Sequence, residues 1–487
     1  MRKFFLLLAA ALVLFVGFTV AVTARYESAQ PPVQPAPKVA IPGGAAERLA
    51  GSLRIRTISS EDPAAFDADA FGTLHGYLHT AFPRVHAQLR RETVGTHSLL
   101  YTWQGSDCSL KPILLIGHMD VVPVETGAVD KWHQDPFSGR IVDGFIWGRG
   151  AIDNKSAVLG TLEAVEMLLA EGFQPVRTVH LAYGHDEEVG GGAGAREIAA
   201  VLKARGVELE MVLDEGGVIG EGILPGIAEP VALVGIAEKG FVTIELSTRV
   251  AGGHSSLPPR QSAVGILSAA VAKLEENPMG ARLEGPTRQL FDRIGPRFPI
   301  ARRAVFANLW LTVPLVLRSL EERPTTNAMV RTTTAPTIFQ AGTKDNVLPS
   351  YARAVINFRI LPGDTVATVV EHVRRALGDS RVEVKIVGRF SAEPSAVSST
   401  DSESFKTLER TIRRVVPDAV VAPYLVVVAT DARYYSGLSR NVFRFLPLRL
   451  TSRDLERMHG IDERIGIREY ETAIRTYREL VIEATGR

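Results

Sequence analysis

Four short segments of the chain place side chains that bind metals at the ends of apolar stretches or in tight turns. They are Gly117-His118-Met119-Asp120, Ile152-Asp153-Asn154-Lys155, His185-Asp186-Glu187-Glu188 and Leu213-Asp214-Glu215-Gly216. In open α/β sheets the carboxyl ends of the strands form the crevice in which ligands bind. Adjacent carboxylates repel one another unless a cation lies beside them. We therefore expect a cation site of imidazole and carboxylate groups, since the single cysteine, Cys108, excludes a cysteine-based cluster.

Each of these residues, taken alone, also has an ordinary structural explanation. His118 fits a strand end capped by solvent, Asp153 fits the cap of a helix, and the two glutamates fit a solvated loop. His459, a further candidate, fits a surface position by its spacing alone. Repetition across successive strand and helix units is the more specific signal. In that arrangement Asp120 is placed to accept the second imidazole N–H of His118 and to fix its tautomer.

The segments lie within alternating strands and helices. Apolar runs predict strands at 112–116, 177–183 and 209–213, and apolar residues at helical spacing predict helices between them. A last helix is expected over 470–484. This alternation predicts an α/β fold whose mostly parallel mixed sheet has helices on both faces.

The pattern changes near Lys239, where an inserted α+β lid is expected to interrupt the first domain. Two βαβ-like halves are predicted from strands at 241–248, 328–340, 351–361 and 381–390 and helices at 262–276 and 366–377. The expected domains are a signal peptide or membrane anchor (1–24), a Pro-rich linker (25–44), a catalytic domain in two parts (45–238 and 392–487) and a lid of the dimerisation type (239–391).

The amino-terminal segment predicts export. Arg2 and Lys3 precede an uncharged stretch over 4–24, which at roughly 20 residues is long enough to span a bilayer as a helix. Val22-Thr23-Ala24 also presents the small residues that a signal peptidase accepts. The segment is thus either a membrane anchor or a cleaved signal, and the catalytic part is membrane-anchored or secreted (periplasmic).

Composition and missing motifs exclude several classes of protein. With 55 basic and 54 acidic residues the formal net charge is +1, so no global field attracts nucleic acid, and no nucleic-acid partner is expected. The chain contains neither the G-x-S-x-G motif of a serine hydrolase nor the H-E-x-x-H motif of a one-zinc protease.

The motifs HMDVVP, GRGAIDNKS, HDEE, DEGG, GHSS and MHGIDER together resemble the aminoacylase, carboxypeptidase S and glutamate carboxypeptidase family of two-zinc exopeptidases. The stretches NAMVRTTTAPTIFQAG and NVLPSYARAVINFRILPG are most similar to the N-fatty-acyl-amino-acid hydrolase/synthase and carboxypeptidase S branch. The resemblance covers nearly the whole chain after the linker. It implies a zinc-dependent hydrolase of amide bonds next to a free carboxylate, acting as a carboxypeptidase, as an N-acyl-amino-acid amidohydrolase or as a reversible N-fatty-acyl-amino-acid synthase/hydrolase. The substrate would be a small molecule or short peptide.

The same resemblance implies two zinc ions per subunit. One is held by His118 and Asp214, the other by Glu188 and His459, and Asp153 bridges both. Glu187 is implied as the general base, with Asp120 and His254 as further catalytic residues.

The lid is expected to contact the substrate. By resemblance, His254 stabilises the tetrahedral oxyanion, a role that a neighbouring subunit of a homodimer can supply. Arg359 fits a bidentate partner for a substrate carboxylate, and as a strand residue it fits a structural ion pair equally well. The remaining candidates for substrate contacts are Asn327, Asn346 and Arg433. Close relatives carry Gly and Asn where this chain has Val428-Ala429, which changes the expected shape of the substrate pocket.

Two further alternatives are open at this point. The apolar stretch 306–317, which contains Trp310, fits the wall of a fatty-acyl pocket, a surface that touches the membrane, or lid core. A non-catalytic receptor or binding protein that retains the fold is the alternative function. The full set of metal-competent residues together with Glu187 argues against it.

Overall fold

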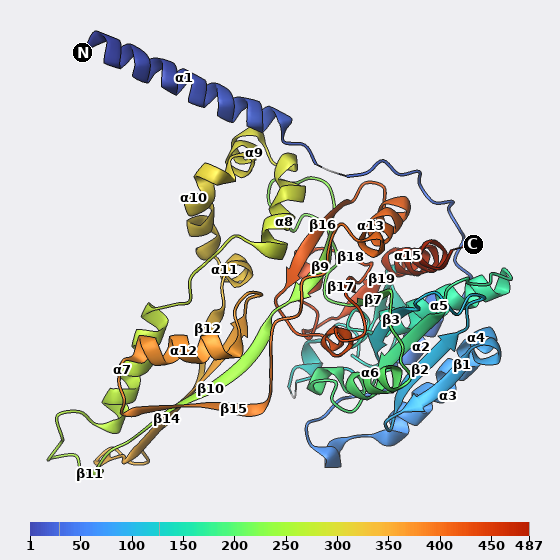
Figure 1. Cartoon of the computed structure of the whole chain (residues 1–487). Helices are drawn as coiled ribbons and strands as arrows, with labels where there is room; N and C mark the ends of the chain where they lie inside the picture. Colours follow the sequence, from blue (N-terminus) through green and yellow to red (C-terminus); the bar gives the residue numbers. More distant parts are fainter. Residues whose placement is uncertain (29, 126, 487) are drawn as a thin grey trace.

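The computed structural model describes residues 1–28, 30–125 and 127–486, and its catalytic part is built around a ten-stranded mixed sheet (Figure 1). The strand order is β1-β2-β6-β3-β7-β17-β9-β8-β18, with β16 beside β9. At the centre β3 (Ile113–His118) runs parallel to β6 (Val179–Gly184) and to β7 (Met211–Asp214). The other strands are β1 (Arg90–Val94), β2 (Ser98–Trp103), β8 (Ile219–Gly220), β9 (Val231–Glu238), β16 (Val420–Val426), β17 (Val442–Arg444) and β18 (Arg449–Leu450).

Helices cover both faces of this sheet because successive strand residues alternate between them. Ile113 and Leu115 of β3 pack in one core with α5 (Lys155–Ala170), α13 (Glu403–Val415) and α15 (Ile467–Thr485). Leu114 and Ile116 pack in a second core with α6 (Ala195–Ala204). The predicted α/β class, with its largely parallel centre and two helical layers, is confirmed.

The lid is a separate four-stranded antiparallel sheet of order β12-β14-β10-β15. Its elements are β10 (Gly240–Arg249), α7 (Ala263–Glu276), β12 (Thr333–Ala341), β14 (Tyr351–Ile360), α12 (Val366–Leu377) and β15 (Val382–Ala392). The two helices share one hydrophobic core with the sheet. The two expected βαβ-like halves are present as β10-α7-β12 and β14-α12-β15, and their strands interleave in one sheet because β14 lies between β12 and β10. The strand predicted from Ala328 starts at Thr333 because residues 328–330 belong to a helix.

A group of helices that the sequence pattern did not predict lies between the lid sheet and the amino-terminal helix (Figure 1). It consists of α8 (Gly285–Ile294), α9 (Ile300–Ala307), α10 (Leu309–Glu321) and α11 (Pro324–Val330). Proline at the first helical turn starts both α8 and α11, since its missing N–H has no helical partner there anyway. Helix α8 packs against β16, so the group is attached to the catalytic sheet.

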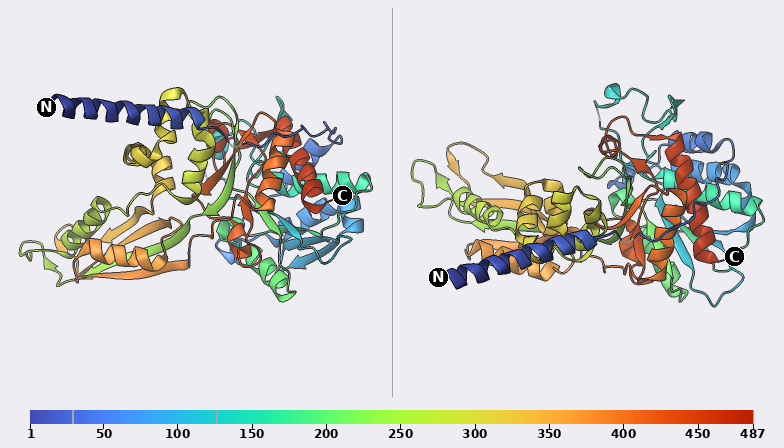
Figure 2. Two further views of the ribbon diagram at one scale, coloured as in Figure 1. Left: turned by 45° about the horizontal axis from the view of Figure 1, so that its top comes forward. Right: turned by 90° about the horizontal axis from the view of Figure 1, so that it is seen from above.

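The amino-terminal helix α1 (Arg2–Arg25) projects from the molecule (Figures 1 and 2). Among the described residues it is the one continuous helix long and apolar enough to cross a membrane, and it fits a signal or an anchor. The Pro-rich segment after it runs over the surface of the catalytic part. Gln30 exchanges two hydrogen bonds with the backbone of Val421, Ala36 N–H donates to Arg414 O, and Arg475 donates to Val39 O.

Candidate metal centre and substrate cleft

The carboxylate of Asp153 lies between two imidazoles. Its Oδ1 is 3.0 Å from His118 Nε2, and its Oδ2 is 3.1 Å from His459 Nε2. His118 comes from the end of β3, and Asp153 from the turn that leads into α5. Each oxygen of one carboxylate thus faces a different histidine, which is the arrangement that a ligand bridging two cations requires.

Each imidazole has a second carboxylate neighbour. His118 Nε2 lies 3.2 Å from Glu215 Oε1, and His459 Nε2 lies 3.2 Å from Glu188 Oε2. Two atoms bound to one tetrahedral zinc at about 2.0–2.1 Å lie about 3.3 Å apart. The four separations in the cluster are close to that spacing, and they fall into two sets that share only Asp153.

Asp120 holds the strand-end residues in position. Its oxygens accept the backbone N–H groups of Glu187 (3.2 Å) and Glu188 (3.1 Å). Its Oδ1 also lies 3.3 Å from His118 Nδ1, whose shorter contact, 3.0 Å, is with the Asp120 carbonyl oxygen. One buried carboxylate therefore orients the histidine and both glutamates.

Glu215, and not Asp214, contacts His118. The Asp214 oxygens accept backbone N–H groups, from Glu215 at 2.9 Å and from Ala432 at 2.6 Å. Glu215 points the other way, because successive residues at a strand end face opposite sides, and it accepts a hydrogen bond from Asn154. The DEGG motif lies at the end of β7, and its spacing could not decide which of the two adjacent carboxylates faces the histidine.

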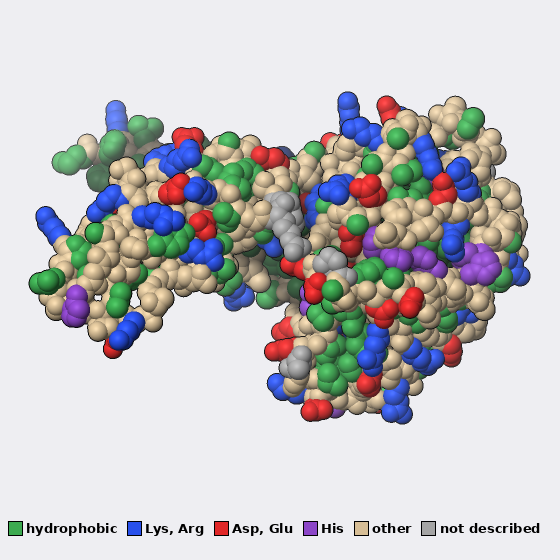
Figure 3. Space-filling view, turned by 90° about the horizontal axis from the view of Figure 1, so that it is seen from below, with side chains coloured by type: hydrophobic (Ala, Val, Ile, Leu, Met, Phe, Trp, Pro, Cys, Tyr) green, Lys and Arg blue, Asp and Glu red, His purple; other side chains and the backbone are tan. Residues whose placement is uncertain are grey.

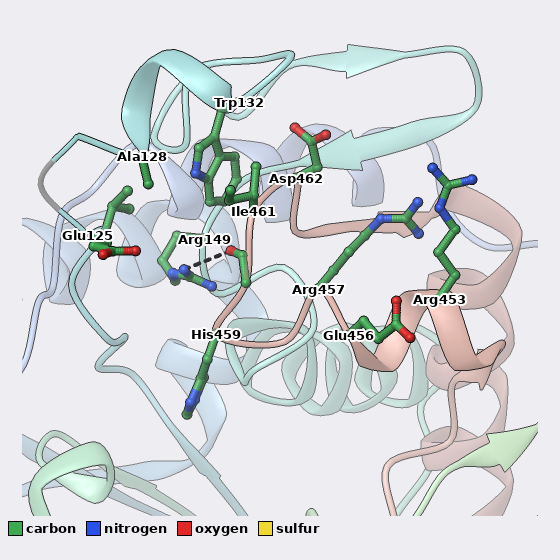
Figure 4. Close-up of a pocket in the computed structure, with 12 residues that line it drawn as sticks. Glu125, Ala128, Trp132, Arg149, Arg453, Glu456, Arg457, His459, Ile461 and Asp462 are labelled. Carbon is green, nitrogen blue, oxygen red and sulfur yellow. Dashed lines mark hydrogen bonds between the residues drawn. The ribbon is translucent and has the colours of Figure 1, made fainter.

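A buried ion pair joins the turn of Asp153 to the loop of His459. Arg149 Nη1 donates to Glu463 Oε2 at 2.6 Å, and Glu463 Oε1 accepts the N–H groups of Ile152 and Asp153. Arg149 also donates to Gly460 O. Both residues line a pocket together with His459, whose ring points away from the other labelled side chains (Figure 4). Nothing in the sequence assigned Glu463 a role, although it lies four residues after His459.

The charges of the cluster favour a bound cation. Burial, reinforced by Asp431, Glu215 and Glu188 and opposed by His118, raises the pKa of Glu187 well above its usual value. Burial also raises the pKa of Glu188, whose Oε1 is buried with no hydrogen-bond partner in the described part of the chain. Hydrogen bonds that His459 donates to the carboxylates of Asp153 and Glu188 raise the pKa of His459 to about 10. His118 belongs to two sets of residues whose possible ligand atoms lie within 4.8 Å of one another. Glu187 and Glu215 complete the first set, and Asp153 and Glu188 complete the second. Mixed imidazole and carboxylate donors fit zinc.

The centre opens into a cleft of about 660 Å³ that both parts of the chain line. Arg359 and Lys239 reach it from the lid, and Arg433 from the catalytic part. Arg359 lies over the ring of Phe241 at 4.8 Å, and Arg433 Nη2 donates to Gly190 O at 2.8 Å. In the space-filling view a hollow separates the two parts, and acidic side chains gather on its catalytic side (Figure 3).

Three predicted site residues lie away from this cleft. His254, on the short strand β11 (Gly253–His254), is at the far end of the lid from the catalytic part (Figure 1). Asn346 lies beside it, since its carbonyl accepts the Ser255 N–H at 3.1 Å. Asn327 is in α11 and does not line the cleft. Within one copy of the chain, therefore, His254 and both asparagines are not assembled with the metal cluster.

Comparisons with known proteins identify the family of the chain. A model of the family described as "Peptidase family M20/M25/M40" matches residues 114–483. The chain is 46% identical over 440 residues to "Probable carboxypeptidase S-like 2" of Dictyostelium discoideum, covering 90% of this chain and 84% of that one. It is 40% identical over 439 residues to "N-fatty-acyl-amino acid synthase/hydrolase PM20D1" of Xenopus tropicalis, covering 89% and 85%.

A solved structure supports the fold. The M20 family metallo-carboxypeptidase Sso-CP2 from Sulfolobus solfataricus superposes with a TM-score of 0.64 at 19% identity, covering 90% of this chain and 98% of that one. With the family model, these matches confirm the predicted hydrolase class and imply a divalent metal. The chain belongs to peptidase family M20/M25/M40.

Proposed function

We propose that the chain is a two-zinc hydrolase that cleaves an amide bond next to a free carboxylate, as a carboxypeptidase or as an N-acyl-amino-acid hydrolase and synthase. The Asp153 carboxylate, with one oxygen toward His118 and the other toward His459, carries this proposal. The names of the relatives agree with it. The alternative, a binding protein without activity, is not favoured, because the ligand set and the adjacent Glu187 are complete.

The proposed first zinc site consists of His118 and Glu215, the second of His459 and Glu188, and Asp153 is common to both. Glu215 takes the place that the sequence had given to Asp214. Zinc ions bound there would supply Lewis acidity to a water molecule and to the substrate carbonyl. Asp120 and Glu463 position the ligands through the contacts described above.

Glu187 is proposed as the general base, as the resemblance implies, since its carboxylate lies within 4.8 Å of the donor atoms of His118 and Glu215 and it directly precedes the proposed ligand Glu188. Its carboxylate takes a proton from the attacking water and returns it to the leaving nitrogen. Burial raises the pKa of this carboxyl, which favours holding the proton between the two steps.

Arg359 is proposed to bind the substrate carboxylate, helped by Arg433. The rest of the cleft wall is largely apolar and includes Leu233, Tyr424 and Met458, which suits an apolar acyl group or side chain. Val428 and Ala429 are part of this wall, where the relatives were expected to carry Gly and Asn.

His254 is proposed to act in the cleft of a second copy of the chain, because within one copy it lies at the end of the lid far from the catalytic part (Figure 1). The lid also exposes the apolar side chains Ile338, Phe339 and Ile386, which a homodimer would cover. Mixing two inactive variants, Glu187→Gln and His254→Ala, tests this. In an exchanging dimer, about a quarter of all sites would then have both residues intact and regain activity. Mixtures as inactive as their components would exclude the second copy.

We further propose that the chain is exported and held at the membrane by α1, with the catalytic part outside. The uncharged helix behind Arg2 and Lys3 supports this orientation. Processing after Ala24 would release the catalytic part instead, and the molecular mass of the mature chain distinguishes the two.

The full-length chain, purified in detergent, tests the activity. N-acetyl-, N-oleoyl- and dipeptide substrates with a free carboxylate are incubated before and after thorough chelation, and zinc is measured per chain. We expect hydrolysis that chelator abolishes and zinc restores, and that Glu187→Gln loses while keeping its zinc. Glu456→Gln, an exposed residue of the same loop region as His459, is the matched control. Full activity after complete metal removal would contradict the proposal.

A further inference from the structure

The helical hairpin of α9 and α10 carries an exposed apolar surface beside the amino-terminal helix. Ile300, Trp310, Leu311 and Leu315 are 72%, 59%, 49% and 61% exposed. Taken together, α9 and α10 are apolar enough to pass as a membrane span, but they meet at an angle of 113°, so they do not form one. The hairpin residues 300–321 include three arginines and one acidic residue, Glu321, which pairs with Arg331. Such a surface on an otherwise polar protein marks a contact with another apolar phase.

The hairpin is attached to α1 by specific contacts. The Trp310 ring packs edge-on against Phe15 and Phe18, with centroids 6.0 Å apart in both pairs. Asn308 Nδ2 donates to Thr23 Oγ1 at 3.1 Å, and Arg303 donates to Tyr26 O at 2.7 Å. The hairpin and the carboxyl-terminal half of α1 lie side by side in all views (Figures 1 and 2).

These contacts fix the depth of the hairpin relative to a bilayer. Helix α1, with 24 residues, is about 36 Å long, enough for a hydrocarbon core of about 30 Å. Phe15 and Phe18 precede Arg25 by ten and seven residues, which is about 10 to 15 Å along the helix axis. If α1 crosses the bilayer with Arg25 at the outer surface, Trp310 lies within the outer leaflet.

The neighbouring surface has the composition of a membrane interface. An apolar hollow lined by Phe298, Phe306 and Leu315 opens beside the hairpin, and its charged lining residues are Arg302, Arg323 and Glu322. It shares no described lining residue with the metal cleft, so it is not the wall of the substrate site that the stretch 306–317 suggested. Exposed apolar residues, with more arginines than acidic residues around them, suit a lipid surface better than a second protein chain.

We propose that the α9–α10 hairpin inserts into the outer leaflet of the membrane beside α1 and forms a second, monotopic lipid contact. The body of the enzyme is then held at two points. The helix alone would leave it free to rotate, whereas the hairpin and the Pro-rich segment, bound along the catalytic surface, fix its orientation. This proposal rests on the proposed insertion of α1, and the test separates the two.

Trp310 reports directly on the contact. It is exposed, whereas the three other tryptophans, Trp103, Trp132 and Trp147, are buried in the catalytic part. The full-length chain is reconstituted into vesicles of phosphatidylcholine and phosphatidylglycerol, with or without bromine atoms on the acyl chains, and tryptophan emission is measured. Contact with lipid predicts quenching of roughly one quarter of the emission, the share of one tryptophan in four, by brominated lipid. Trp310→Phe should lose that quenching.

A second variant guards against misinterpretation. Leu311→Asp with Leu315→Asp places charges on two exposed positions, so folding should be preserved, and unchanged hydrolytic activity verifies it. In this variant Trp310 should become accessible to aqueous iodide and lose its quenching by lipid. Chain that sediments with vesicles but shows the same quenching with and without Trp310 would overturn the proposal. Trp310 shielded from both quenchers would also overturn it, since it indicates a second protein chain on the hairpin. Chain that fails to associate with vesicles at all would contradict the insertion of α1, while hydrolysis would remain testable in detergent.

Discussion

Replacing the two adjacent carboxylates Asp214 and Glu215 one at a time tests how the metal centre is built. In Glu215→Gln the charge next to His118 is lost, while an acceptor for Asn154 remains. Changes in residues that merely support a metal ligand usually lower affinity 10- to 100-fold. Loss of a direct ligand should therefore weaken one zinc by about 100-fold or more, which is ~2.7 kcal/mol at 1.36 kcal/mol per factor of ten.

Asp214→Asn should behave differently. Both Asp214 oxygens accept backbone N–H groups, so the new amide NH₂ would face a donor. That mismatch should cost about 1–3 kcal/mol of unfolding free energy and leave zinc affinity within about tenfold of the wild type.

The assay is competition for zinc with a chromogenic chelator, together with zinc content and a thermal melt for each variant. We expect Glu215→Gln to lose one zinc and retain its melting temperature in the metal-free state, and Asp214→Asn to retain both zincs and melt earlier. The opposite result, with Asp214→Asn losing zinc and Glu215→Gln retaining it, would refute the reasoning from side-chain direction and restore the ligand expected from the sequence.

Three further predictions concern the support, the substrate and the sheet. Glu463→Gln leaves Arg149 buried without its charged partner. We expect the free energy of unfolding, measured by denaturant titration, to fall by about 3–5 kcal/mol and the zinc affinity to weaken about 10- to 100-fold. An unchanged zinc affinity would show that the pair is purely structural. Arg359→Lys removes the planar guanidinium group that fits a carboxylate, so KM should rise about tenfold at nearly constant kcat. Arg353→Lys on the same strand is the control. A pure loss of kcat would place Arg359 in the chemical step. Burial lowers the pKa of His180 to about 4, below its value in the unfolded chain. Between these two pKa values the unfolded state binds more protons than the folded state. The free energy of unfolding should therefore fall by about 3 kcal/mol at most as the pH drops from about 6.5 to about 4. The denaturant midpoint of His180→Gln should lack this part of the pH dependence. Parallel curves of midpoint against pH for the variant and the wild type would contradict the prediction.

Local patterns predicted the parts of the fold whose signal lies within a few residues. The strands that end at His118, Gly184 and Asp214 and the helix that follows Asn154 were visible as apolar runs and helical spacing. The lid was predicted from a change in the pattern of strands and helices near Lys239, and its exact boundaries remain a prediction.

Contacts between distant segments could not be predicted in the same way. The pairing of β12 with β14 and of β10 with β15 depends on register across the lid, so the sequence predicted the two βαβ-like halves but not the order in which their strands interleave in one sheet. Helices α8 to α11 are short, and α10 contains a proline, Pro314, which is not expected inside a helix. The role of Glu463 depends on Arg149, more than three hundred residues earlier, which no local pattern contains.

The separation of His459 from Asp153 along the chain has a consequence for biosynthesis. This histidine and the Glu463 that holds the Asp153 turn follow Asp153 by more than three hundred residues. A nascent chain that extends only to the lid already contains His118, Asp153, Glu187, Glu188 and Glu215, but it lacks His459 and Glu463. The proposed second metal site can therefore form only after the lid and the second part of the catalytic domain have been made.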